Sequence, residues 1–162
     1  MSVSGVLIRR LTPDDWAAYR EIRLAALAES PEAFGSTLER EQQFTEEIWR
    51  SRLTTAATFA AERDDDLIGI AAGLPTAIAG SAILISMWIA PDARRRGIGE
   101  ALVLRIISWA QVEGFSRLEL EVTTGNSTAE RLYERCGFTR NGETMSINTE
   151  QEHQTIMMVR EI

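Results

Sequence analysis

The spacing of apolar residues along the chain separates helical from extended segments. Val6-Leu7-Ile8 is a short apolar run that predicts a strand. After it, Thr12-Pro13-Asp14-Asp15 combines a capping residue, a proline and two acids, as expected where a helix begins. Ser30-Pro31 should end this helix, because a residue before proline is driven out of the helical conformation. A second helix is predicted to begin near Thr45, and residues 29–44 are predicted to be a mobile or functional segment.

Extended segments dominate the middle of the chain. Residues 58–61 and 67–74 are predicted to form two strands joined by a charged hairpin turn. Residues 80–90 are almost continuously apolar, the pattern of a strand that is covered on both faces near the centre of a sheet. A helix over residues 97–113 should pack on this sheet, and alternation over residues 118–122 predicts a half-buried strand. Because a helix joins these last two strands, we expect them to be parallel.

The last part of the chain predicts a helix from Asn126 to Gly137, followed by an antiparallel pair of strands near residues 138–147 and 154–161. No internal repeat is visible. A length of 162 residues with 44% hydrophobic residues is enough for a single core, so we expect residues 1–162 to form one domain.

The charge balance narrows the classes of partner. A net charge of −7 argues against binding to nucleic acid or to a membrane surface, because both need clustered cations, and it mildly favours a cationic substrate. Cys136 is the single cysteine and one histidine is present, so neither a disulfide nor a metal site is predicted. No apolar run approaches the roughly 18 residues of a membrane helix, and no leader is recognisable. We therefore expect a cytoplasmic protein.

An arginine-rich loop with two glycines, Arg94-Arg95-Arg96-Gly97-Ile98-Gly99, separates the apolar strand from the long helix. Unpaired N–H groups in the first turn of a helix bind anions, and glycine lets a ligand approach them closely. Leu102 stands where a dinucleotide-binding motif needs a third small residue, and the chain has no lysine for a triphosphate-binding P-loop. The remaining alternatives are a phosphate site of another type and a glycine-containing helix start with solvated charges.

Two separate windows resemble the signatures of the GCN5-related N-acetyltransferase (GNAT) family. The loop from Arg94 to Gly99, after Ile89-Ala90-Pro91, is similar to the pyrophosphate loop of that family. The second signature is resembled by Asn126, Ala129, Leu132-Tyr133 and Gly137-Phe138. The resemblance implies an α/β GNAT-like acyl-CoA N-acyltransferase fold. In that fold a twisted, mostly antiparallel sheet has a central parallel pair that splays apart, and about four helices flank the sheet.

The resemblance also implies that acetyl-CoA binds as a co-substrate between the strands that end near Ile89 and Thr123. The pantetheine arm would contact the backbone of Met87, Trp88 and Ile89, and also Asn126. The pyrophosphate would be held by Arg94, Arg95, Arg96, Gly97, Ile98, Gly99 and Glu100. Tyr133 would donate a proton to the CoA thiolate as an acceptor amine attacks the acetyl carbonyl directly. Two plainer interpretations stay open: Tyr133 as a core residue and Asn126 as a helix cap.

The general base and the acceptor are not assigned by the sequence. No carboxylate lies on residues 83–89, where many relatives carry a glutamate, and Ser86 is the only side chain there that can accept a hydrogen bond. The candidate bases are Glu119, Glu121, Glu29 and Glu32, or a chain of waters. The acceptor would be a small-molecule amine or a protein amine, and Gly35-Ser36-Thr37 is expected to line its site. A non-catalytic acyl-CoA sensor or interaction module is the alternative function, and a homodimer is left open.

Overall fold

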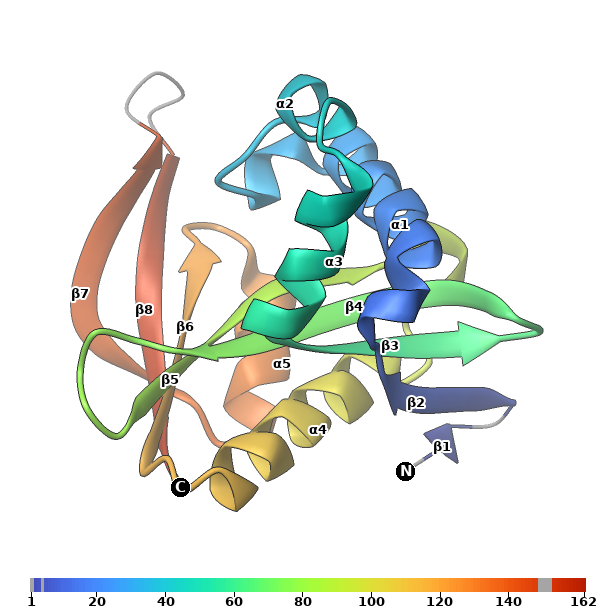
Figure 1. Ribbon diagram of the computed structural model, residues 1–162. Coiled ribbons are helices and arrows are strands. Elements are labelled where there is room, and N and C mark those ends of the chain that lie inside the picture. Colours follow the sequence, from blue (N-terminus) through green and yellow to red (C-terminus); the bar gives the residue numbers. More distant parts are fainter. Residues whose placement is uncertain (1, 4, 149–152) are drawn as a thin grey trace.

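The computed structural model describes residues 2–3, 5–148 and 153–162, with the side chains of residues 5–141 and 155–162. A single mixed sheet runs through this part of the chain in the order β1-β2-β3-β4-β5-β6-β8-β7 (Figure 1). Its strands are β1 (Ser2–Val3), β2 (Val6–Arg10), β3 (Ala57–Arg63), β4 (Asp66–Pro75), β5 (Ser81–Ile89), β6 (Arg117–Thr123), β7 (Thr139–Asn148) and β8 (His153–Glu161). All neighbours are antiparallel except β5 and β6, which confirms the predicted parallel pair.

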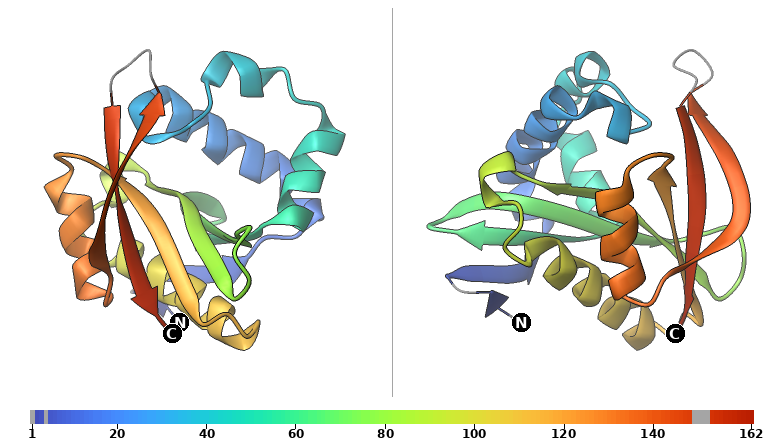
Figure 2. Two further views of the ribbon diagram at one scale, coloured as in Figure 1. Left: turned by 90° about the vertical axis from the view of Figure 1, so that its left-hand side faces the viewer. Right: turned by 180° about the vertical axis from the view of Figure 1, so that it is seen from behind.

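Helices cover both faces of this sheet. One face carries α1 (Trp16–Glu29), α2 (Leu38–Gln42) and α3 (Glu46–Thr55), and the other carries α4 (Ile98–Val112) and α5 (Ser127–Arg135), as the views of Figure 2 show. The expected start signals are used: Asp15 and Thr12 form a capping box, and Thr45 accepts a hydrogen bond from the Ile48 amide. The structure confirms the GNAT-like architecture, with the short α2 in addition to the four helices that were expected. In the described residues, no helix is long and apolar enough to cross a bilayer.

The segment over residues 29–44, for which no element was predicted, is partly regular. It contains a 3₁₀ turn (Pro31–Ala33) and α2, which is capped by Thr37 through the amide of Arg40. The helix has five residues and little apolar character, so its pattern could not be recognised from the sequence.

Two apolar cores lie on opposite faces of the sheet. On the α4 side, Leu102 and Ile106 pack with Leu84 and Leu120. On the α1 side, Tyr19, Trp49 and Trp88 are packed together with further residues of the helices and of β4. The buried residues of β6 alternate as predicted, so Leu118, Leu120 and Val122 all belong to the core on the α4 side.

Strand β5 changes its pairing halfway along its length. Residues Ser81 to Leu84 pair with β6 in parallel register, and no pairing follows beyond Leu84. On the β4 side, one residue, Ala71, stands opposite two, Ser86 and Met87, between the pairs Ala72↔Ile85 and Ile70↔Trp88. Ser86 has a left-handed backbone with φ of 59°, so it belongs to a β-bulge.

The bulge explains where the predicted two-sided burial of residues 80–90 fails. Ala82, Leu84 and Trp88 are buried as expected, but Ile85 is 38% exposed. Because the extra residue shifts the alternation of the strand, both Ile85 and Ser86 line the same cavity on the α1 side of the sheet. The bulge therefore lies close to the place where β5 and β6 separate.

Candidate active site

The loop before α4 has the backbone shape of an anion-binding turn. Arg95 and Gly97 adopt left-handed conformations, with φ values of 64° and 80°, and α4 begins at Ile98. The first hydrogen bond into this helix is donated by the Ala101 amide to the Gly97 carbonyl, so the amides of residues 98–100 have no partner within the helix. The helix dipole adds positive potential at this end. These amides can bind a phosphate group.

Gly99 provides a second reason to regard the loop as a ligand cradle. A Cβ atom on Gly99 would lie 3.2 Å from Cδ2 of Leu132 on α5. Any larger side chain would have to displace Leu132 or occupy the space in front of the first-turn amides. The glycine thus lets α4 lie close to α5 and leaves the first-turn amides accessible to a ligand.

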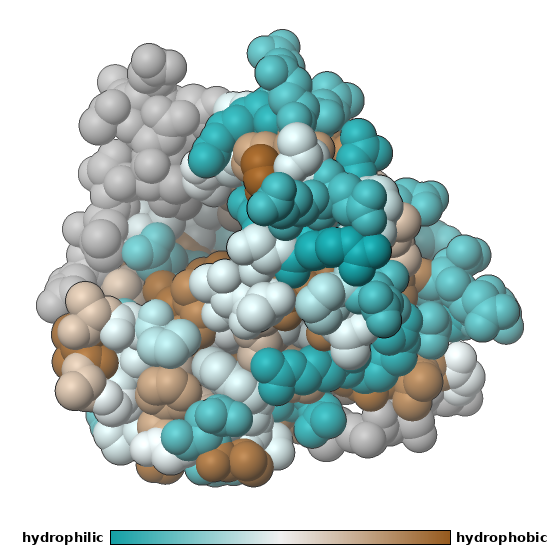
Figure 3. Space-filling model, in the orientation of Figure 1, coloured by the Kyte–Doolittle hydropathy of each residue, from teal (hydrophilic) through white to brown (hydrophobic). Residues whose placement is uncertain are grey.

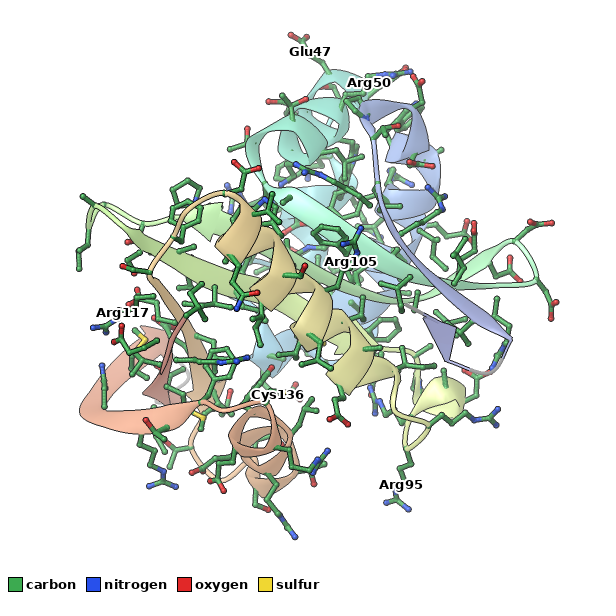
Figure 4. All side chains as sticks on the ribbon, turned by 90° about the horizontal axis from the view of Figure 1, so that it is seen from below. Glu47, Arg50, Arg95, Arg105, Arg117 and Cys136 are labelled. Carbon is green, nitrogen blue, oxygen red and sulfur yellow. The ribbon has the colours of Figure 1, made fainter. Side chains whose placement is uncertain are left out.

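The three arginines of the loop differ in their contacts. Nη2 of Arg94 lies 2.6 Å from Oε1 of Glu29, and its Nε donates a hydrogen bond to the Ile89 carbonyl at 3.0 Å. Arg94 therefore ties the loop to the end of α1 and to the end of β5. Arg95 and Arg96 are exposed and make no ion pair with any residue that the structure describes, and Arg95 points away from the body of the molecule in Figure 4. Of the three, Arg95 and Arg96 are the ones free to approach an anion.

Glu29 is held in place by its neighbours. Its carboxylate accepts hydrogen bonds from the Ser30 hydroxyl, from Nε1 of Trp88 at 2.9 Å and from Arg94. These bonds lower the pKa of Glu29 from its ordinary value of 4.5 to about 2. Such a carboxylate is a weak proton acceptor near neutral pH, and it acts as a brace between α1 and the loop.

The free edge of β5 faces the gap beside β6. The Ala90 amide donates to the Ile68 carbonyl, so by the alternation of an antiparallel ladder Trp88 also turns its backbone groups toward β4, and Ile89 turns its own toward the gap. The contact between Arg94 and the Ile89 carbonyl fits this orientation. Of the three residues expected to bind the pantetheine arm, Ile89 therefore presents its backbone to the gap, whereas that of Trp88 is committed to β4.

Tyr133 lies on α5 and is buried, 6% exposed, with its ring edge-on to Phe138. Burial raises the pKa of the Tyr133 hydroxyl, which therefore stays protonated, and it has no hydrogen-bond partner in the described part of the chain. Asn126 caps the same helix by accepting a hydrogen bond from the Ala129 amide at 3.2 Å. The cap interpretation of Asn126 is confirmed, and its exposed position leaves the amide nitrogen available to a ligand.

A cavity of about 340 Å³ lies on the other face of the sheet, between α1, α3 and the bulge of β5. Its walls combine apolar residues, Ile48, Leu74 and Ile85, with the polar side chains of Tyr19, Arg23, Arg52 and Ser86. Figure 3 shows this face, where α1 to α3 are mainly hydrophilic and apolar surface is exposed beside them. Gly35-Ser36-Thr37, which we expect to line the acceptor site, are not among the residues that line this cavity, because it lies at α3.

Buried charges support the wall of this cavity. Glu41 on α2 is fully buried and accepts two hydrogen bonds from Arg23, at 2.9 and 3.0 Å, and one from Arg52 at 2.8 Å. Arg23 also donates to Oγ of Ser86 at 3.0 Å. Burial opposes ionisation of Glu41, but hydrogen bonds from Arg23 and Ser36 and the charges of the two arginines lower its pKa to about 2. Glu41 therefore stays ionised and holds both guanidinium groups.

The other candidate bases differ in position. Glu119 lies 3.5 Å from Arg117, and its side chain is only 12% exposed. Glu121 is exposed and points to the face opposite Leu120, which is the face that carries α1 and α3. If the pairing of Leu84 with Leu120 continued, Glu121 would stand opposite Ile85. Glu32 is exposed on the 3₁₀ turn after α1. Glu121 is thus the first carboxylate of β6 beyond the last residue that pairs with β5.

A sequence model of the acetyltransferase (GNAT) family matches residues 16–138, which include both signature windows and the cavity walls. The chain belongs to the GNAT family. A mycothiol acetyltransferase from Renibacterium salmoninarum is 32% identical over 144 residues, which cover 85% of this chain and 41% of that protein. The chain thus spans less than half the length of this curated relative.

Solved structures show the same GNAT fold. An acetyltransferase of the GNAT family from Streptococcus pneumoniae superposes with a TM-score of 0.80 and 24% identity, covering 97% of this chain and 99% of that one. The Salmonella typhimurium protein yncA, solved with its cofactor acetyl-CoA, gives a TM-score of 0.79 at 18% identity, over 97% and 94% of the two chains. At these identities the likeness concerns the fold.

Sequence reasoning singled out the loop and Tyr133 as candidates but missed the charged cluster of Arg23, Glu41 and Arg52. These residues come from three different helices, and charged side chains on helices are normally solvated. One signal was present, because Arg23 falls on the apolar stripe of α1 together with Tyr19 and Leu27. A charge at a core position needs a buried partner.

Proposed function

We propose that this chain transfers the acetyl group of acetyl-CoA to a primary amine by direct attack. The observation that carries the proposal is the separation of β5 from β6 directly beside the free amides of α4. A strand edge without a partner can hold the amide-bearing pantetheine arm, and the helix start can hold the pyrophosphate. Acetyl-CoA supplies an activated acetyl thioester when it is bound there.

Different residues of the chain bind the cofactor and transfer the protons. The amides of residues 98–100 and the charges of Arg95 and Arg96 bind and orient phosphate, while the Ile89 backbone binds the arm. Burial raises the pKa of Tyr133, so its hydroxyl carries a proton before the reaction. We assign to this hydroxyl the donation of its proton to the departing thiolate, whose negative charge is thereby neutralised. Glu121, alone or through water, accepts the proton of the acceptor ammonium. Glu29 is unsuited to that role, since its pKa is about 2 and its Oε1 accepts three hydrogen bonds.

Replacement of Tyr133 by phenylalanine tests the proton-donor role. Tyr133→Phe should lower kcat about a hundredfold, within the range for general acids, while the affinity for acetyl-CoA measured by calorimetry changes little. The substitution should leave thermal stability nearly unchanged, because no hydrogen bond of the hydroxyl to a described residue is lost. Wild-type turnover in the variant would reject the role.

A panel of primary amines, assayed by CoA release, tests the reaction itself. Release above background with at least one amine supports the enzyme. If CoA binds with ordinary affinity and no amine is acetylated, the chain is a non-catalytic acyl-CoA-binding module instead. The names of the mycothiol acetyltransferase relatives do not decide the acceptor, since the match covers less than half of the first of them.

A further inference from the structure

The cavity at the bulge of β5 is positively charged, although the protein as a whole carries a net charge of −7. Its described lining includes Arg23 and Arg52 and no acidic side chain. Glu41 lies behind the two arginines, fully buried, and balances only one of them. A positive charge therefore remains at the cavity wall, and it disfavours a substrate that carries positive charge alone.

The two arginines differ in how many N–H groups remain free to donate a hydrogen bond to a ligand. Arg23 is 6% exposed, and its three nitrogens donate to Glu41 and Ser86. It also stacks against Phe34, with 4.7 Å between its guanidinium carbon and the ring centre. Arg52 uses Nη1 for Glu41, and its side chain is 30% exposed. A guanidinium has five N–H donors, so Arg52 keeps donors that can reach a ligand in the cavity.

The geometry points to Arg52 as the anchor for a carboxylate on the acceptor, so that the substrate class is a small amine that also carries a carboxylate and an apolar side chain. This inference rests on the proposed acetyl transfer. A planar guanidinium matches a carboxylate through paired hydrogen bonds, and Glu41 fixes its orientation in advance. The apolar wall formed by Ile48, Leu74 and Ile85 would contact the side chain of the substrate.

Binding of the substrate carboxylate to Arg52 also brings the substrate amine toward the gap between β5 and β6. The cavity extends from Arg52 on α3 to Ser86 on β5, and Ser86 stands where β5 leaves β6. A molecule whose carboxylate binds at the α3 end directs its amine toward the gap that is proposed to hold the acetyl group. An apolar α-amino acid has both groups and a side chain of suitable character.

The test compares matched acceptors that differ only in the carboxylate. Phenylalanine and methionine are assayed beside phenylalaninamide and methioninamide, with wild-type protein and with Arg52→Gln, Arg52→Lys and Arg50→Gln. We expect the wild type to show a kcat/KM about tenfold or more higher for the acids than for the amides. Arg52→Gln should remove this preference by weakening the acids alone, and Arg52→Lys should keep part of it because the charge remains.

Arg50→Gln is the matched control, because Arg50 (labelled in Figure 4) pairs with Glu46 and Asp14 and does not line the cavity. It should behave like the wild type. Equal or better use of the amides by the wild type, with acetylation intact, overturns the carboxylate anchor and leaves the proposed function standing. If no amine is acetylated, the proposed function fails separately. Binding of N-acetylphenylalanine against its amide, measured by calorimetry with CoA present, then decides the anchor: no difference between the two overturns it.

Discussion

Glu41 makes the stability of the protein depend on pH. Its pKa is about 2 in the folded chain against an ordinary value of 4.5, so the folded state binds this proton less readily than the unfolded state. The stabilisation is complete above about pH 4.5 and is lost as the pH falls toward 2. A shift of this size corresponds to about 3 kcal/mol of unfolding free energy. Part of the acid sensitivity of the fold should therefore come from this one buried carboxylate.

Glu41→Gln should lower the unfolding free energy by about 3 kcal/mol at pH 7, because Arg23 is left buried without a charged partner. The difference from wild type should shrink as the pH is lowered toward 2, as measured by urea unfolding at a series of pH values. Glu46→Gln is the control, since Glu46 forms an exposed pair with Arg50 and should change stability by less than about 1 kcal/mol. If the difference in unfolding free energy between Glu41→Gln and the wild type stays constant with pH, Glu41 is not ionised as assigned.

At the scale of single elements, the bulge in β5 holds a serine in a strained conformation. Ser86 has a φ of 59°, which glycine adopts freely and alanine does not. Ser86→Gly and Ser86→Ala both remove the hydrogen bond from Arg23, so their difference reports the backbone conformation together with the Cβ atom, without that bond. We expect the glycine variant to be more stable than the alanine variant by roughly 1 kcal/mol in chemical denaturation.

Ser81, at the start of the same strand, provides the control for this comparison. It is buried and has no left-handed backbone. There the order should reverse, because glycine in regular strand structure costs more conformational entropy than alanine. If the glycine variant is the less stable one at both positions, the bulge carries no backbone strain.

The elements also show how far the sequence could predict the structure. The alternation at Leu118, Leu120 and Val122 and the cap at Thr45 are local signals, and the structure follows them. The bulge at Ser86 contains no glycine or proline that would indicate it in the sequence. The insertion of β8 between β6 and β7 depends on contacts between distant segments, which local patterns do not encode. The loop before α4 was therefore predictable, while the cavity between α1, α3 and the bulge was not.

For the whole molecule, the parallel pair is a short junction in the middle of the sheet. β5 and β6 pair over only Ser81 to Leu84, whereas β6 and β8 pair along seven residues from Arg117 to Thr123. The part of the sheet that contains β1 to β5 is thus joined to β6, β8 and β7 by a short ladder and by the packing of α4. A ligand in the gap would contact both parts at once.

Binding of CoA should therefore stabilise the molecule at this junction. At a concentration of 100 times Kd the unfolding free energy should rise by about 2.7 kcal/mol. Hydrogen exchange should slow at the Ile89 amide, which faces the gap, and at the amides of residues 98–100, which have no partner in the helix. Amides of the remote hairpin turn at residues 64–65 should exchange at the same rate with and without CoA, because they open locally. Stabilisation by CoA without slower exchange at Ile89 would mean that the arm does not lie along β5, even if the phosphates bind at α4.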